Sequence, residues 1–66
     1  MRLTDFWYRL EQVFGAGYAR SVADDQVLAR LGGRTITEAL AQGVETVDVW
    51  RAVVATYPER VPQRLR

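Results

Sequence analysis

Carboxylates are the side chains of this sequence whose number and spacing come closest to supporting acid–base chemistry. Asp24 and Asp25 are adjacent, and Glu38, Glu45 and Asp48 follow within one short stretch. Two carboxylates can act as general acid and general base where a buried pocket separates their pKa values. The sequence indicates no such pocket, and helix capping accounts for Asp24 and Glu38. We therefore predict no catalytic residue and no metal ligand, with a weak divalent-cation site as the alternative.

The residue types that most often carry catalysis are absent. The 66-residue chain has no cysteine, no histidine and no lysine, so all nine basic residues are arginine. This composition excludes thiolate nucleophiles, imidazole bases, Schiff-base lysines and the commonest transition-metal ligands. We predict a protein that is not an enzyme and has no cofactor.

The charge balance argues against the most common charged partners. Nine arginines stand against eight carboxylates, which gives a net charge of +1. Nucleic-acid-binding modules of this size are usually strongly basic, because neutralised phosphates supply much of their affinity. No apolar run approaches the roughly 20 residues that span a bilayer, and the N-terminus has no apolar signal core. We expect a cytoplasmic protein that does not bind membranes.

The first helix is predicted near the N-terminus. Thr4 is expected to cap it, with Asp5 in its first turn, and Gly15 and Gly17 are expected to end it. Its apolar residues fall within roughly a third of the helical circle. They are Leu3, Phe6, Trp7, Leu10, Val13 and Phe14. Tyr8 falls on the polar side.

The middle segment, residues 18–31, predicts two short helices. The apolar side chains of its two halves point in nearly opposite directions on one continuous helical wheel. A chain this small has little with which to cover both faces of a single helix. We therefore predict helices over residues 17–23 and 25–31, with Asp24 or Asp25 capping the second and a pair of glycines ending it.

Residues 34–57 predict a helix-turn-helix-like unit. Thr35 and Glu38 fit a capping box that opens a short helix, which Gly43 ends. Thr46 is expected to cap the second helix, which carries a broad apolar face. That face comprises Val47, Val49, Trp50, Val53, Val54 and Tyr57.

These elements predict an all-α fold. We expect a small single-domain bundle of about four to five short helices, with Trp7 and Trp50 in its core and a helix-turn-helix-like C-terminal half. Pro58 lacks the amide hydrogen that a continuing helix requires. The helical domain is therefore expected to cover residues 1–57, and residues 58–66 are expected to form an irregular C-terminal tail.

The leading functional interpretation is a non-enzymatic protein-interaction module, an adaptor or modulator of another protein. Its expected contact is the outer face of the first helix, at Tyr8, Arg9 and Gln12. Tyrosine supplies a large contact area with few rotors to order, and flanking charges set orientation. We expect a protein partner, and a chain that is a monomer or a weak homo-oligomer.

The alternative function is a weak nucleic-acid-binding module that uses the helix-turn-helix-like unit. Arg34 and Arg51 would be its contacts. Two features argue against it: Glu38 and Gln42 stand where DNA-binding units place apolar residues, and Asp48 on the outer face would repel phosphates. DNA binding is therefore the second interpretation.

The sequence also resembles a known family over nearly its whole length. The matching residues are Met1-Arg2-Leu3-Thr4-Asp5-Phe6-Trp7, Phe14-Gly15, Tyr18-Ala19, Val27-Leu28, Leu31-Gly32-Gly33-Arg34-Thr35, Glu38-Ala39-Leu40, Gly43 and Val49-Trp50-Arg51-Ala52-Val53. They are similar to the small actinobacterial proteins grouped as domain of unknown function 3046. The blocks 31–35 and 49–53 are the most specific.

The resemblance implies a small, helical, cytoplasmic protein, and it implies no activity, cofactor or catalytic residue. Some members of the family are encoded near the recombinase gene involved in DNA repair. Many members carry a cysteine just after the second specific block, where this chain has Val54. A thiol is therefore not essential to the role of this version.

Overall fold

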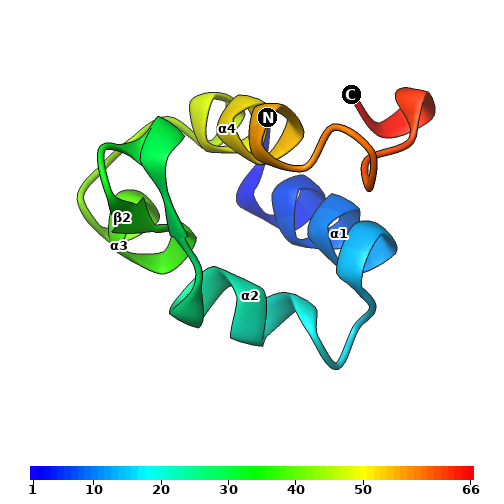
Figure 1. Cartoon of the computed structure of the whole chain (residues 1–66), viewed down its shortest axis with the longest axis horizontal. Coiled ribbons are helices and arrows are strands. Elements are labelled where there is room, and N and C mark those ends of the chain that lie inside the picture. Colours follow the sequence, from blue (N-terminus) through cyan, green and yellow to red (C-terminus); the bar gives the residue numbers. More distant parts are fainter.

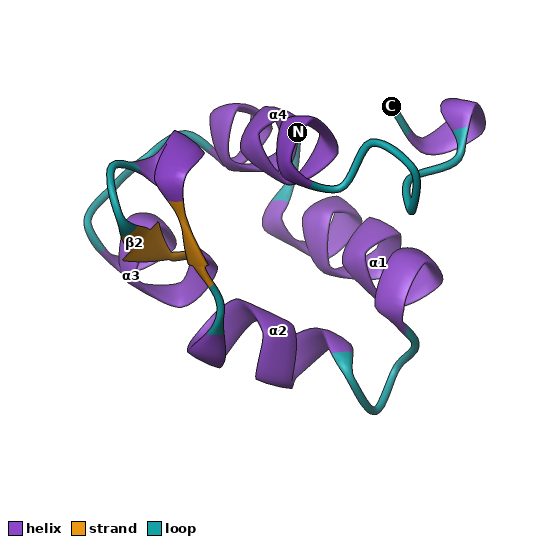
Figure 2. Cartoon of the chain, in the orientation of Figure 1, coloured by secondary structure: helices purple, strands orange, loops and turns teal.

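In the computed structural model, which describes all 66 residues, the helices α1 and α4 lie next to each other, and the shorter helices α2 and α3 complete a ring of four helices around the core (Figure 1). A two-stranded antiparallel sheet lies between α2 and α3 in the chain (Figure 2). The elements are α1 (Leu3–Phe14), α2 (Ala19–Asp25), β1 (Val27–Leu28), the 3-10 turn η1 (Ala29–Leu31), β2 (Arg34–Thr35), α3 (Ile36–Ala41), α4 (Thr46–Thr56) and the 3-10 turn η2 (Gln63–Leu65).

The core is centred on the ring of Trp50, which is 1% exposed. Phe6 of α1 meets this ring edge-on, with 5.9 Å between the ring centroids. The prediction of Trp50 in the core is confirmed. Trp7 lies at the edge of the core and is partly buried. The guanidinium carbon of Arg20 lies 4.0 Å from the centroid of the Trp7 ring.

Helix α1 begins before the residue predicted to cap it. Its N-cap is Arg2, which makes no side-chain cap hydrogen bond, so the prediction of Thr4 as the cap is wrong. The reason is that the Phe6 amide already bonds to the Arg2 carbonyl at 3.0 Å, which places Thr4 inside the helix. The predicted end is confirmed, since Gly15 follows the last turn with a φ of 92°, a conformation that glycine adopts at no steric cost.

The middle of the chain is a helix followed by a hairpin, and not two helices. Helix α2 continues through Asp25, and the predicted helix over residues 25–31 is wrong. Val27 pairs with Thr35 and Leu28 with Arg34 in an antiparallel register. The fold is therefore dominated by helices but is not strictly all-α.

Two features explain this difference. Gly32 and Gly33 take φ values of 70° and 78°, and the Gly33 amide bonds to the Leu28 carbonyl at 3.1 Å, which reverses the chain. Asp24 does not cap a new helix, because its carboxylate accepts a hydrogen bond from the hydroxyl of Thr37. This bond ties α2 to α3.

The capping box at the start of α3 is confirmed. The Thr35 hydroxyl accepts from the Glu38 amide at 3.0 Å, and the Thr35 amide donates to the Glu38 carboxylate at 2.8 Å. The predicted cap of α4 is wrong, because Thr46 is the first residue of that helix and Glu45 precedes it as the N-cap without a side-chain bond.

The segment after Pro58 is structured, in contrast to the irregular tail that its sequence suggests. It forms η2 and places Val61 and Leu65 in the hydrophobic core. The Leu65 carbonyl accepts hydrogen bonds from Trp50 Nε1 at 2.9 Å and from Arg9 Nη1 at 3.3 Å. The segment therefore contacts both α1 and α4.

Candidate functional site

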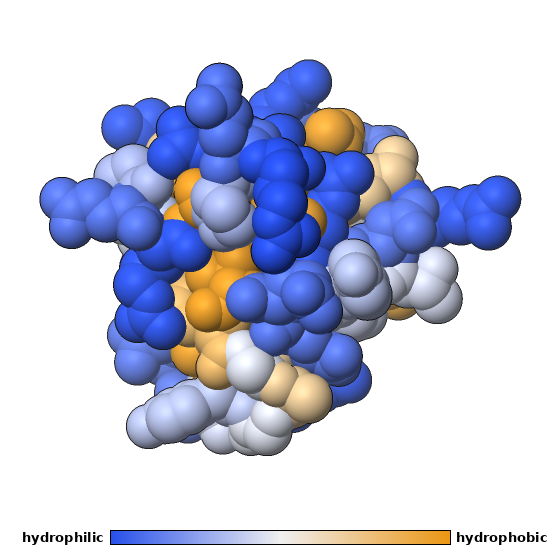
Figure 3. Space-filling model, turned by 90° about the vertical axis from the view of Figure 1, so that its right-hand side faces the viewer, coloured by the Kyte–Doolittle hydropathy of each residue, from blue (hydrophilic) through white to orange (hydrophobic).

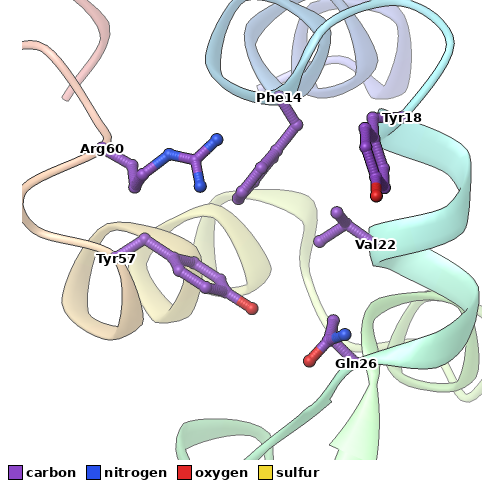
Figure 4. Close-up of a pocket in the computed structure, with 6 residues that line it drawn as sticks. All are labelled: Phe14, Tyr18, Val22, Gln26, Tyr57 and Arg60. Atoms are coloured by element: carbon purple, nitrogen blue, oxygen red, sulfur yellow. The ribbon is translucent and has the colours of Figure 1, made fainter.

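One pocket opens where α1 ends, α2 begins and α4 ends (Figure 4). It has a volume of about 340 Å³ and is lined by Phe14, Tyr18, Val22, Gln26, Tyr57 and Arg60. Small-molecule sites occupy roughly 300–1,000 Å³. The pocket is thus at the small end of that range, and it suits one large side chain of a partner or a small ring.

Residues that break helices place the aromatic walls of the pocket. Gly15 ends α1 directly after Phe14, and its carbonyl accepts from the amides of Tyr18 and Ala19 at 3.1 and 2.9 Å. Helix α4 ends at Thr56 with Tyr57 as its C-cap, and Pro58, which lacks an amide hydrogen, prevents the helix from continuing. The rings of Phe14 and Tyr57 meet edge-on, with centroids 5.1 Å apart and an interplanar angle of 82°.

A turn after α4 returns Arg60 to the pocket. The Arg60 amide bonds to the Tyr57 carbonyl at 3.0 Å. Its guanidinium carbon lies 4.9 Å from the centroid of the Phe14 ring, and Figure 4 shows the Arg60 side chain extending toward that ring. The attraction between a cation and an aromatic ring holds the guanidinium at the rim.

The pocket carries positive charge without a compensating carboxylate. Arg60 is the only charged residue in its lining, and the side chain of Arg60 makes no ion pair and no hydrogen bond. The ion pair of this structure joins Arg51 and Asp48 at 3.3 Å and does not involve the pocket. An aromatic surface with one unpaired cation favours anionic partners.

The pocket opens onto exposed surface. Tyr18 of the lining is 71% exposed. Figure 3 shows apolar surface surrounded by hydrophilic side chains on the face where α1 ends and α2 begins. Isolated exposed apolar residues are ordinary, whereas an exposed aromatic ring in the wall of a pocket is typical of a binding surface.

The polar groups in the pocket are two phenol hydroxyls, one amide and one guanidinium, all of which can form hydrogen bonds to a ligand. No three carboxylates of the structure come together as metal ligands. None of the helices combines the length and the apolar character that a membrane crossing requires.

A protein-family model matches residues 1–64 of the 66-residue chain and carries the description "Protein of unknown function (DUF3046)". The chain belongs to the DUF3046 family. No curated protein and no solved structure matches it. All six pocket residues of this DUF3046 protein lie within the matched range.

The predicted partner contacts lie on α1. Tyr8 is 59% exposed and Gln12 is exposed, so both side chains are available at the surface. Arg9 is partly buried, because its guanidinium bonds to the Leu65 carbonyl and lies 5.9 Å from the Trp50 ring centroid. The Arg9 side chain of this DUF3046 protein therefore contacts interior groups and is only partly available to a partner.

The two arginines predicted to contact nucleic acid form hydrogen bonds or an ion pair with other residues of the chain. Arg34 donates to the Leu31 carbonyl at 2.7 Å and to the Gln42 side chain at 2.6 Å. Arg51 pairs with Asp48 on α4. They lie on separate elements, β2 and α4, and neither lines the pocket.

The pocket as a site was missed by reasoning from sequence. Phe14 and Tyr57 are read as members of apolar helix faces, and Arg60 as part of a tail. The available signal is that each aromatic residue stands directly before a helix breaker, Gly15 or Pro58. A residue directly before a helix breaker lies at a helix terminus. Its ring can form the wall of a pocket there, instead of packing at the centre of the core.

Proposed function

We propose that this DUF3046 protein is a non-enzymatic protein-interaction module, a small adaptor or modulator, which binds its partner through the pocket between α1, α2 and α4. The observation that supports it most is the aromatic pocket itself, in which the Phe14 and Tyr57 rings meet under an arginine and Tyr18 is largely exposed. Tyrosine and arginine are enriched among the residues that dominate binding energy at protein interfaces.

The pocket is a better candidate than the outer face of α1 for a physical reason. Tyr8 offers a single ring, whereas the pocket offers a concave site in which a partner side chain is desolvated on several sides. Tyr8, Arg9 and Gln12 are then a secondary contact. The proposal includes a cytoplasmic location and a chain that is a monomer or a weak homo-oligomer.

The test compares two exposed tyrosines in the same chain. Proteins from the native host are captured on the wild type, on Tyr18→Ala and on Tyr8→Ala, and the affinity of the captured partner is measured. We expect Tyr18→Ala to weaken binding by about tenfold or more, because loss of a dominant interface residue costs about 2 kcal/mol. Both variants should melt near the wild-type temperature, since surface substitutions shift stability little.

Tyr8→Ala is the matched control. If it abolishes capture and Tyr18→Ala does not, the contact is the outer face of α1 and the pocket proposal is wrong. If both variants bind as the wild type does, the partner uses neither tyrosine, and the pocket is again wrong.

The nucleic-acid alternative has weaker support. The turn between α3 and α4 contains Gly43 with a φ of 88°, which is compatible with a helix-turn-helix-like unit. Its candidate contacts are Arg34, bonded within its own hairpin and to Gln42, and Arg51, paired with Asp48. An arginine already paired with a carboxylate has to lose that partner before it neutralises a phosphate.

A further inference from the structure

We infer that the pocket binds an acidic peptide segment of the partner protein, in which a large apolar side chain enters between the aromatic walls and a neighbouring Asp or Glu pairs with Arg60. This inference rests on the proposed function and adds the chemistry of the partner to it.

The charge of the pocket favours an acidic segment. Arg60 is the only charged residue of the lining and has no carboxylate partner in the chain. A lysine or arginine of a basic peptide would be repelled by this guanidinium, whereas a carboxylate would be attracted to it. A phosphate is a poorer fit, because phosphate recognition usually recruits a cluster of arginines and Arg60 is alone in this lining.

The Arg60 guanidinium is oriented by the Phe14 ring. Its carbon lies 4.9 Å from the centre of the Phe14 ring, so the ring restrains the group at the rim. The guanidinium N–H donors of Arg60 make no hydrogen bond within the chain. A guanidinium presents its donors in a planar fork that matches the two oxygens of a carboxylate. Restraint by Phe14 lowers the entropy lost when that pair forms.

Apolar and polar groups lie in separate parts of the pocket. Phe14, Val22 and Tyr57 are only partly buried, so their apolar surfaces remain available to a ligand. Figure 4 shows Arg60 on one side of this surface and Gln26 well away from it, across the pocket. An apolar side chain can therefore be bound between them, with the Gln26 amide placed to bond to the peptide backbone.

The experiment selects short random peptides on the immobilised full chain and measures the affinity of the selected peptides by NMR titration. We expect enrichment of peptides that carry Asp or Glu beside Phe, Leu or Trp, and chemical-shift changes at the pocket. Arg60→Gln should weaken these peptides by about threefold to tenfold, the range that an exposed but well-oriented ion pair supplies. Arg60→Lys, which keeps the charge but loses the fork, should give an intermediate affinity.

Arg51→Gln is the matched control, because it removes one exposed arginine outside the pocket and changes net charge by the same amount. It should leave peptide affinity unchanged. Equal weakening by Arg51→Gln and Arg60→Gln would show that general charge, and not the pocket, attracts the peptides, and would overturn the inference.

The remaining outcomes separate this inference from the proposed function. Selected peptides that are neutral or basic, or that bind Arg60→Gln as tightly as the wild type, overturn the acidic partner and leave the pocket as a protein-binding site. Absence of any selected peptide also overturns the inference. In either case, the loss of host-protein capture in Tyr18→Ala decides the proposed function independently.

Discussion

Trp50 joins parts of the chain that are distant in the sequence. Its ring packs edge-on against Phe6 of the first helix, and its indole N–H donates to the carbonyl of Leu65 close to the C-terminus. Only 15 of the 66 residues are buried, so a single large side chain at the centre carries a substantial share of the core. At this scale, Trp50 is the residue on which stability depends most.

Substitution of Trp50 should therefore unfold the protein. Trp50→Ala is expected to cost about 3–5 kcal/mol through lost burial and a cavity. Stability in a chain this small lies near the lower end of the roughly 5–15 kcal/mol that domains reach. Thermal unfolding followed by circular dichroism should show no cooperative transition. A cooperative melt within a few degrees of the wild type would contradict the central position of Trp50.

A second substitution removes the hydrogen bond of the indole while it keeps an aromatic ring in the core. Trp50→Phe keeps an aromatic ring but leaves the Leu65 carbonyl without its indole donor, and Arg9 as its remaining donor. Loss of a buried donor costs about 1–3 kcal/mol. This variant should remain folded and melt at a lower temperature.

Among the helices and strands, sequence patterns predict those features that depend only on residues close together in the chain. The capping box of Thr35 and Glu38 is found from sequence because both partners lie within one helical turn. The pairing of β1 with β2 is not found from sequence, because strands of two residues are too short to show the alternation of apolar and polar residues. The burial of Val61 and Leu65 is hidden for another reason: isolated apolar residues among prolines and arginines become core only through tertiary contact.

The pocket could not be predicted from sequence either, because it too depends on tertiary contacts. The walls come from the ends of α1 and α4 and from one side of α2, so the shape of the pocket depends on how these three helices pack. Sequence can indicate that Phe14 and Tyr57 stand at helix ends. It cannot show that their rings meet, because they are far apart in the chain and no local pattern connects them.

The packing of η2 gives a testable consequence at this scale. Leu65→Ala should destabilise the protein by about 2–3 kcal/mol, because the Leu65 side chain is buried in the core. The neighbouring Arg64→Ala is the control, since Arg64 is exposed and its loss should stay within about 0.5 kcal/mol. Urea unfolding measures both. Equal, small effects would mean that the segment after Pro58 does not contribute to the core in solution.

At the scale of the whole molecule, most of the chain is surface, and that surface is close to neutral. The net charge is +1. Nine arginines and eight carboxylates nearly cancel over the whole chain. This balance leaves little net positive charge with which to displace the counterions of a duplex.

We therefore expect no sequence-specific binding to duplex DNA. Any affinity should be weak and should fall steeply as salt rises, because only non-specific phosphate contacts are available. Fluorescence anisotropy with labelled duplexes at several salt concentrations measures this. Submicromolar affinity for a defined duplex at physiological salt, lost in Arg51→Ala, would instead favour the helix-turn-helix-like alternative.

The bonds to the Leu65 carbonyl also determine when the protein can fold during its synthesis. Arg9 and Trp50 leave the ribosome before Leu65, yet both donate to its carbonyl, and the contact between Arg9 and Leu65 spans 56 residues. Translation proceeds from the N-terminus, and a domain completes its folding only when its long-range contacts can close. The hydrogen bonds from Arg9 and Trp50 to this carbonyl therefore cannot form until Leu65 has emerged from the ribosome.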